Sequence, residues 1–182
     1  MKKKIIALFA VILCLAIAAS SCGSDISALE NLCFAIREFD LEKAQKYVYD
    51  GEGYLEKAVN TASKLTPEQA EIAKLVYSHM QFSDFKEEDG YFSLTVKYVD
   101  FYNLKKDVEF RTSIGSSATE VLREMLAGSG FAAKYTKTRE DVRILIKNNV
   151  SGACVPLGHA SDNSFFTAIL GLDTFLEWYT LQ

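Results

Sequence analysis

The sequence predicts an α+β fold in which N-terminal helices pack on a curved antiparallel sheet. Apolar residues recur at helical spacing through residues 26–80, and alternation with polar residues replaces that spacing in residues 92–98. Helices followed by strands in separate blocks are typical of an α+β domain. The 182-residue chain has two prolines and is 49% hydrophobic, which argues against disorder.

Four helices are expected before residue 81. The first covers residues 26–39, where Ser27 and Glu30 have the spacing of a capping box. Asp40 is expected to cap a short second helix, because its side chain can accept a hydrogen bond from a free backbone amide.

The third and fourth helices follow a loop at residues 50–53. Apolar residues at helical spacing place the third helix over residues 55–65. Thr66-Pro67-Glu68-Gln69 is a strong helix start, because it combines a cap, a proline at the first helical position and a glutamine three residues after the cap.

A β-hairpin is expected next. Residues 92–98 alternate between apolar and polar side chains, and residues 87–90 have the composition of a turn, so residues 81–86 should be the partner strand. Residues 142–146 and 150–157 are also predicted to be strands.

Residues 103–127 allow two interpretations. Alternation over residues 108–114 favours a strand, followed by a helix over 118–127 that begins with a Ser117–Glu120 capping box. Alternatively, Asn103 caps one long helix. The poor helix formers of residues 111–117 slightly favour the first interpretation.

The C-terminal tail is unusually apolar. Residues 165–181 hold 11 apolar side chains in 17 positions, divided at Gly171 into two helical pieces. This density is too high for a one-sided surface helix. We expect the tail to close the core, and the alternative is a docking surface for a partner or a bilayer.

The first 21 residues have the three parts of an export signal. Lys2, Lys3 and Lys4 precede an uncharged run from Ile5 to Ala19, and small residues follow that run. The run is shorter than the roughly 20 residues of a membrane-spanning helix. We therefore expect the signal to be removed.

Ala19-Ser20-Ser21-Cys22 resembles the lipobox of bacterial lipoproteins. The resemblance implies that a diacylglycerol is attached to the Cys22 thiol and that cleavage leaves Cys22 as the N-terminus. Leucine is usual where Ala19 stands, and Ala16-Ile17-Ala18 also fits ordinary signal cleavage, which would release a soluble protein. The expected organisation is a signal peptide (1–21), a tether (22–25) and one domain (26–182), anchored on the extracytoplasmic face of the cell membrane.

The charge of the mature chain is mildly acidic. Without Lys2, Lys3 and Lys4, the 20 basic residues fall to 17 against 24 acidic residues, a net charge of −7. This balance argues against a nucleic-acid partner and against electrostatic attraction to anionic lipid.

Helices followed by a curved antiparallel sheet on a lipid anchor resemble small lipoproteins of Gram-positive bacteria with a nuclear-transport-factor-two-like (cystatin-like) domain. The likeness is carried by Phe34-Ala35 and Phe39-Asp40-Leu41-Glu42-Lys43-Ala44, by the hairpin 81–99, and by residues 163–171. It implies a cone-shaped sheet that either holds a ligand pocket or is filled. In that family, one long helix over residues 103–127 would be usual.

Catalytic chemistry has one candidate. Cys154 and His159 lie close in sequence, and Asp162 could orient the histidine, as a thiol enzyme requires. The stretch around Cys154 faintly resembles the Ser-x-Gly-Cys motif of the L,D-transpeptidases of the cell envelope, but Ala153 and Pro156 replace its glycine and arginine. We expect a structural thiol instead.

Cys33 and Cys154 are the two cysteines that remain after the signal and the anchor. Outside the cytoplasm they could form a disulfide, although separate buried thiols are the favoured alternative. Two distant histidines and two distant cysteines give no metal-ligand spacing, so we expect no metal and no cofactor. The favoured function is a non-catalytic module that binds a small apolar ligand or a protein, and the rival is the thiol enzyme.

Overall fold

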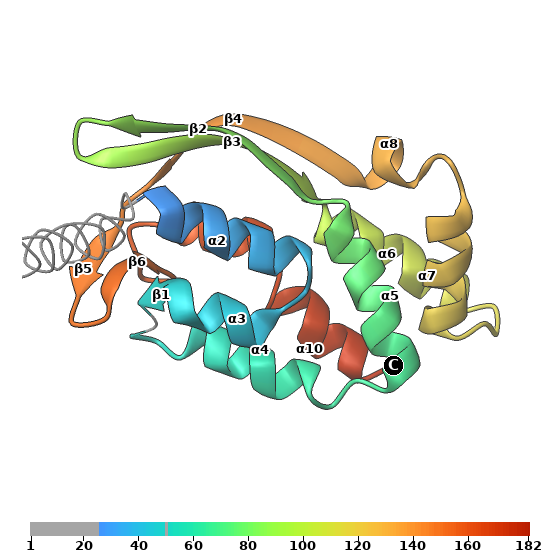
Figure 1. Cartoon of the computed structure of the whole chain (residues 1–182). Helices are drawn as coiled ribbons and strands as arrows, with labels where there is room; N and C mark the ends of the chain where they lie inside the picture. Colours follow the sequence, from blue (N-terminus) through green and yellow to red (C-terminus); the bar gives the residue numbers. More distant parts are fainter. Residues whose placement is uncertain (1–25, 50) are drawn as a thin grey trace, which may run out of the picture.

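The computed structural model describes residues 26–49 and 51–182, and it confirms the α+β fold with 52% helix and 23% strand. A three-stranded antiparallel sheet runs along one side of the molecule, and the N-terminal helices lie beneath it (Figure 1). The predicted signal peptide, Cys22 and the tether 22–25 lie outside the described residues.

The N-terminal helices follow the predicted order. They are α2 (Ile26–Arg37), α3 (Leu41–Ala44), α4 (Tyr54–Ala62) and α5 (Pro67–Ser78), with a 3-10 turn η1 (Gln45–Tyr47) and a strand β1 (Val48–Tyr49) between α3 and α4.

Local capping explains where these helices begin. Asp40 caps α3 by accepting a hydrogen bond from the Lys43 amide at 3.0 Å, and Thr66 and Gln69 complete the predicted capping box of α5. The capping box expected at Ser27 is wrong, because Ser27 already lies inside α2.

The predicted hairpin is confirmed as β2 (Gln81–Glu88) and β3 (Tyr91–Val99), and β4 (Thr136–Ile144) pairs with the other edge of β3. The inward side chains of β3 are buried, while α2 contacts β2 and α9 (Ser164–Leu170) contacts β3. This face of the sheet therefore forms one wall of the core.

The predicted helix over 118–127 is confirmed, but residues 103–117 form neither of the two predicted structures. Residues 103–127 belong to two helices, α6 (Phe101–Thr112) and α7 (Ala118–Ala127), so the strand over 108–114 and the single long helix are both wrong. Asp100, rather than Asn103, caps α6, and it accepts a hydrogen bond from the Asn103 amide at 3.2 Å. The Ser117–Glu120 capping box is confirmed at the start of α7.

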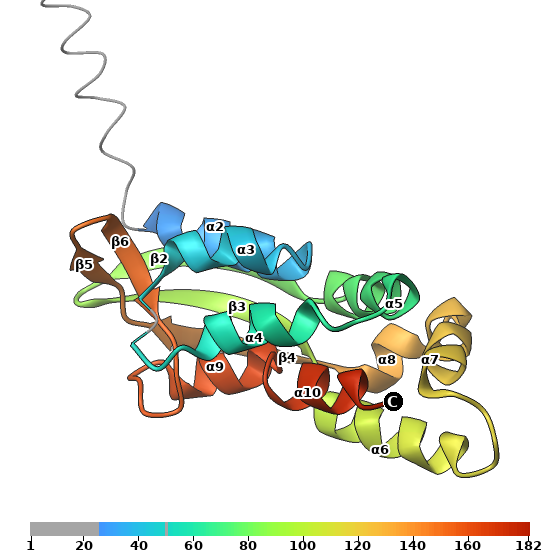
Figure 2. The same cartoon turned by 90° about the horizontal axis from the view of Figure 1, so that it is seen from below.

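A second, smaller sheet lies at the opposite end from α6 and α7. It contains β5 (Lys147–Asn149), β6 (Gly152–Pro156) and β1, in the order β1-β6-β5, and β1 runs parallel to β6. The short helix α8 (Phe131–Tyr135) leads from α7 into β4. Both views place α2 and the β5–β6 hairpin at one end and α6, α7 and α8 at the other (Figure 2).

The apolar tail closes the core, as expected. It forms α9 and α10 (Thr174–Thr180), which are separated at Gly171. The buried residues of the tail are Phe166, Thr167, Ile169, Leu170, Leu172, Phe175, Leu176, Trp178 and Tyr179. Among the described residues, no helix is long and apolar enough to cross a bilayer.

Candidate functional site

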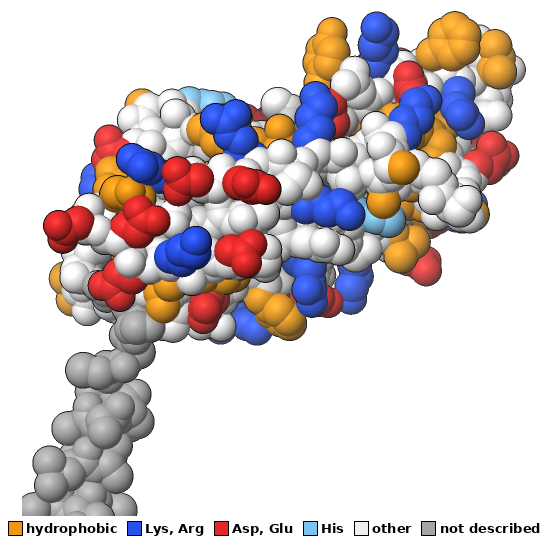
Figure 3. Space-filling view, turned by 90° about the horizontal axis from the view of Figure 1, so that it is seen from above, with side chains coloured by type: hydrophobic (Ala, Val, Ile, Leu, Met, Phe, Trp, Pro, Cys, Tyr) orange, Lys and Arg blue, Asp and Glu red, His pale blue; other side chains and the backbone are white. Residues whose placement is uncertain are grey.

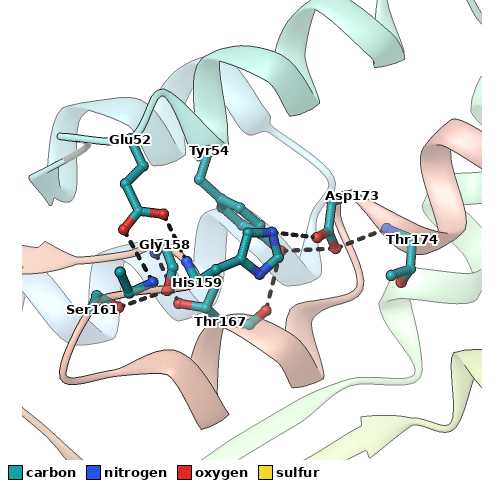
Figure 4. Close-up of polar contacts among 9 residues, drawn as sticks. Glu52, Tyr54, Gly158, His159, Ser161, Thr167, Asp173 and Thr174 are labelled. Atoms are coloured by element: carbon teal, nitrogen blue, oxygen red, sulfur yellow. Dashed lines mark hydrogen bonds and ion pairs between the residues drawn. The ribbon is translucent and has the colours of Figure 1, made fainter.

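A polar cluster surrounds the loop at residues 157–163, where the sequence had suggested a catalytic histidine (Figure 4). Glu52 accepts hydrogen bonds from the backbone amides of His159 at 2.8 Å and Ala160 at 3.1 Å. Gly158 has a φ of +144°, and a Cβ there would lie 2.5 Å from the Glu52 carboxyl carbon. Only glycine therefore allows Glu52 to approach the loop this closely.

The base of the same loop is held from inside the protein. Asn163 is buried and bonds the backbone of two segments: it accepts from the Leu145 amide at 2.9 Å and donates to the Pro156 carbonyl at 3.0 Å. The hydroxyl of buried Thr167 accepts a hydrogen bond from the Gly158 amide at 3.2 Å. These bonds satisfy backbone groups that would otherwise be costly to bury.

The imidazole of His159 is turned toward Asp173. Its Nε2 lies 3.1 Å from an Asp173 carboxylate oxygen, and its ring meets the Tyr54 ring edge-on at 5.9 Å. The Tyr54 hydroxyl donates to the Thr167 carbonyl at 3.1 Å. Burial, and then the charge of Asp173, raise the pKa of Tyr54, so this hydroxyl stays protonated as a donor.

The structure does not assemble the three residues of the predicted thiol site. Cys154 lies on β6 with a side chain 3% exposed, and no hydrogen bond joins it to His159 within the described residues. Asp162 lies 3.7 Å from the Lys147 ammonium instead of orienting the histidine. His159 is thus left with a carboxylate partner and no thiol.

The two cysteines of the domain are separate. Cys33 and Cys154 are both free and buried, so the disulfide considered from the sequence is not formed. Burial, and then the charge of Glu30, raise the pKa of Cys33 well above its usual range. A thiol in that state is a poor nucleophile.

The described residues hold no group of three or more histidine, cysteine or acidic side chains that could bind a metal. His79, the other histidine, packs against the Phe131 ring at 4.6 Å. Partial burial, and then the charge of Lys97, lower the pKa of His79, which favours the neutral ring.

A concave apolar site lies at the other end of the molecule, between α6, α7 and α8. Its volume is about 260 Å³. Buried Met125, Phe131 and Tyr135 form its floor, and the exposed side chains of Arg111, Glu124 and Lys134 stand at its rim. Gly128 and Gly130 complete the wall, and a Cβ on Gly130 would meet nothing within 4 Å. We call this hollow the α6–α8 pocket.

Asp107 fixes the geometry of this pocket. Its carboxylate accepts hydrogen bonds from the Lys134 ammonium at 2.6 Å and from the Tyr135 hydroxyl at 2.7 Å, and so ties α8 to α6. The Lys134 ammonium, followed by the Tyr135 hydroxyl, lowers the pKa of Asp107. The carboxylate therefore remains charged and the link persists at neutral pH.

Two apolar side chains protrude beside the α6–α8 pocket. Phe110 is 76% exposed and Ile114 is 82% exposed. Phe110 lies in the last turn of α6 and Ile114 in the turn that follows this helix, and Phe110 is the chain neighbour of the rim residue Arg111. Figure 3 shows hydrophobic and basic side chains together at this end of the molecule and a larger share of acidic side chains toward the opposite end.

The sequence carries a signal for this surface in the alternation over residues 108–114. That alternation predicts the buried face of a strand, which is wrong, because α6 buries Val108 and exposes Phe110. Searches of protein-family models, of curated proteins and of solved structures find no match to this chain.

Proposed function

We propose that this chain is an extracytoplasmic lipoprotein, anchored through a lipid on Cys22, that binds a protein partner at the α6–α8 pocket and does not act as an enzyme. The observation that carries the binding proposal is the pocket with Phe110 and Ile114 beside it. Exposed aromatic and aliphatic side chains next to an apolar hollow are the usual anchors of protein interfaces.

The size of the pocket favours a protein over a small apolar ligand. Sites that enclose small molecules usually measure roughly 300–1,000 Å³. The α6–α8 pocket holds about 260 Å³ and is open at one side. It is therefore better suited to a single anchor side chain from a partner, while Phe110 and Ile114 extend the contact around it.

The charged side chains at the rim of the pocket indicate which kind of residue lies next to the anchor side chain in the partner. The Lys134 ammonium is paired with Asp107, whose carboxylate also interacts with the charge of Arg111, and Glu124 is the acidic side chain of the rim. A guanidinium in this position can bind a carboxylate in a bidentate manner. The proposed partner segment therefore has an apolar side chain for the pocket and an acidic one positioned opposite Arg111, away from Glu124.

The thiol enzyme is the weaker alternative. It would need an accessible Cys154 next to a histidine base, and Cys154 is buried while His159 is paired with Asp173. The resemblance to lipid-anchored envelope proteins is compatible with the binding proposal, because such domains need no catalytic residues.

A photo-crosslinking experiment tests the binding proposal. A benzophenone amino acid at Phe110, in the lipidated protein in its native membranes, should give one discrete higher-mass product. The same probe at Val150, an exposed apolar residue at the opposite end, is the matched control and should not give that product. Gly130→Leu should fill the pocket and reduce the Phe110 product at least tenfold.

The Gly130 substitution is expected to leave the fold intact. Gly130 has a φ of −91°, which any residue can adopt, and open space surrounds it. An unchanged melting curve for Gly130→Leu checks this point. The binding proposal fails if the Phe110 and Val150 probes give the same products, or if the Phe110 product is insensitive to Gly130→Leu.

A further inference from the structure

The short tether between Cys22 and α2 limits the distance between this helix and the membrane. Ile26 is the first residue of the described helix α2, four residues after Cys22. Four extended residues span at most about 14 Å. If Cys22 carries lipid, as the proposed function requires, α2 begins within that distance of the membrane surface.

The solvent-exposed face of α2 carries an aromatic residue, Phe34, at a position where a polar residue is usual. Glu30, Asn31 and Phe34 form the exposed stripe of the helix, and Phe34 is 49% exposed. Phe34 lies eight residues after Ile26, which is about 12 Å along a helix axis. The aromatic ring therefore reaches the same bilayer surface when α2 lies along that surface.

Two cations lie against the Phe34 ring. The Arg37 guanidinium is 5.4 Å and the Lys43 ammonium 5.0 Å from the ring centre. Phe is one of the side chains by which surface helices insert at the boundary between headgroups and acyl chains, and long basic side chains extend toward the headgroups. Phe34, Arg37 and Lys43 together form the α2 patch.

We infer that the α2 patch is a membrane-contact surface, and that it rests on the outer leaflet of the bilayer that holds the lipid of Cys22. This inference depends on the anchor in the proposed function and adds the orientation of the domain. It places α6 away from the bilayer, since α2 and α6 lie along opposite edges of the molecule (Figure 2). The α6–α8 pocket then faces outward.

The charges around the patch determine which lipids it recognises. Arg37 is paired with Glu38 at 3.1 Å, and the exposed carboxylates of Glu30 and Glu42 offset Lys43 and its basic neighbours. The patch therefore has little net charge. Contact relies on the aromatic ring and the zwitterionic headgroups, so added anionic lipid should change it less than twofold.

A depth-dependent quenching experiment tests the inference. An environment-sensitive fluorophore is attached to Asn31→Cys, one turn before Phe34, in the lipidated protein on phosphatidylcholine vesicles with headgroup nitroxides. Cys33 and Cys154 are buried, so the new thiol takes the label. The matched control is Lys106→Cys, an exposed position on α6.

The expected result is strong quenching at position 31 and at least fivefold weaker quenching at position 106. Phe34→Ser should reduce the quenching at position 31 severalfold, whereas Phe110→Ser should not. Equal quenching at both positions, or stronger quenching at 106, would overturn the inference while the anchor stands. A protein that does not float with the vesicles at all contradicts the anchor itself, and the inference with it.

Discussion

At the scale of single residues, Gly171 ends α9 in a left-handed conformation and leaves no room for a side chain. Its φ is +61°, and a Cβ at this position would collide with the Phe101 ring. Gly53 has a similar φ of +66°, but its Cβ would meet only the Glu56 carboxylate at 3.8 Å. Comparing substitutions at the two glycines therefore distinguishes the cost of backbone strain from the cost of steric overlap with Phe101.

Gly171→Ala should destabilise the protein much more than Gly53→Ala. Left-handed backbone costs an alanine about 1 kcal/mol in both variants. Overpacking against Phe101 adds about 1–3 kcal/mol at position 171 alone. Urea unfolding followed by circular dichroism measures both values, and equal losses in the two variants would show that Phe101 does not confine this glycine.

The residue-scale features that the sequence predicted are those with partners close in the chain. Asp40, Thr66 and Ser117 cap helices by bonding amides three residues on, so their role follows from spacing. Glu52 and Asn163 could not be assigned in this way. Glu52 accepts a hydrogen bond from a backbone amide 107 positions away, and the residues next to Glu52 in the sequence do not predict this bond.

At the scale of helices, α6 depends on Asp107 for its attachment to α8. The folded-state pKa of Asp107 is lowered, chiefly by the Lys134 ammonium. The link therefore stabilises the fold above the unfolded-state pKa of about 3.9, and this stabilisation is lost as the pH falls through the lower folded-state pKa.

In Asp107→Asn, the free energy of unfolding should fall less steeply between neutral and acid pH than in the wild type. The variant should lose less than about 1 kcal/mol at pH 7, because the pair is partly exposed to water. The difference from the wild type should shrink as the pH falls below 4. Denaturant unfolding from pH 7 to pH 2 checks this, with Glu109→Gln on the same helix as the control.

Two stability curves with the same pH dependence would contradict the assignment for Asp107. The Glu109 carboxylate is 3.8 Å from Lys105 on the outer side of α6, so its removal should have the smaller effect. A larger effect of Glu109→Gln would place the acid-sensitive link elsewhere.

The alternation over residues 108–114 predicts a strand where the structure has the end of α6 and the turn after it. Val108, Phe110 and Ile114 alternate with polar residues, and period-2 alternation predicts a half-buried strand. That inference assumes that every apolar residue in the pattern is buried. In the structure Phe110 and Ile114 are exposed, so the pattern reflects a surface and not a core.

At the scale of the whole molecule, the fold has two distinct ends. The start of α2 and the small β1-β6-β5 sheet lie at one end, and the α6–α8 pocket lies at the other (Figure 1). The N-terminal helices and the β2–β3 hairpin were predictable from hydrophobic periodicity, whereas α6 and α8 were not. The separation of these two ends was not, because it depends on how α6 and α8 pack, and residues 107 and 134 meet only in the folded chain.

Mass spectrometry of the N-terminal peptide of the protein from native membranes tests the central claim most directly. The lipoprotein account predicts a chain that starts at Cys22 and carries the added mass of a diacylglycerol. A chain that starts at Ala19 with an unmodified Cys22, as cleavage after Ala16-Ile17-Ala18 would give, contradicts it. A chain that retains Met1 contradicts it as well.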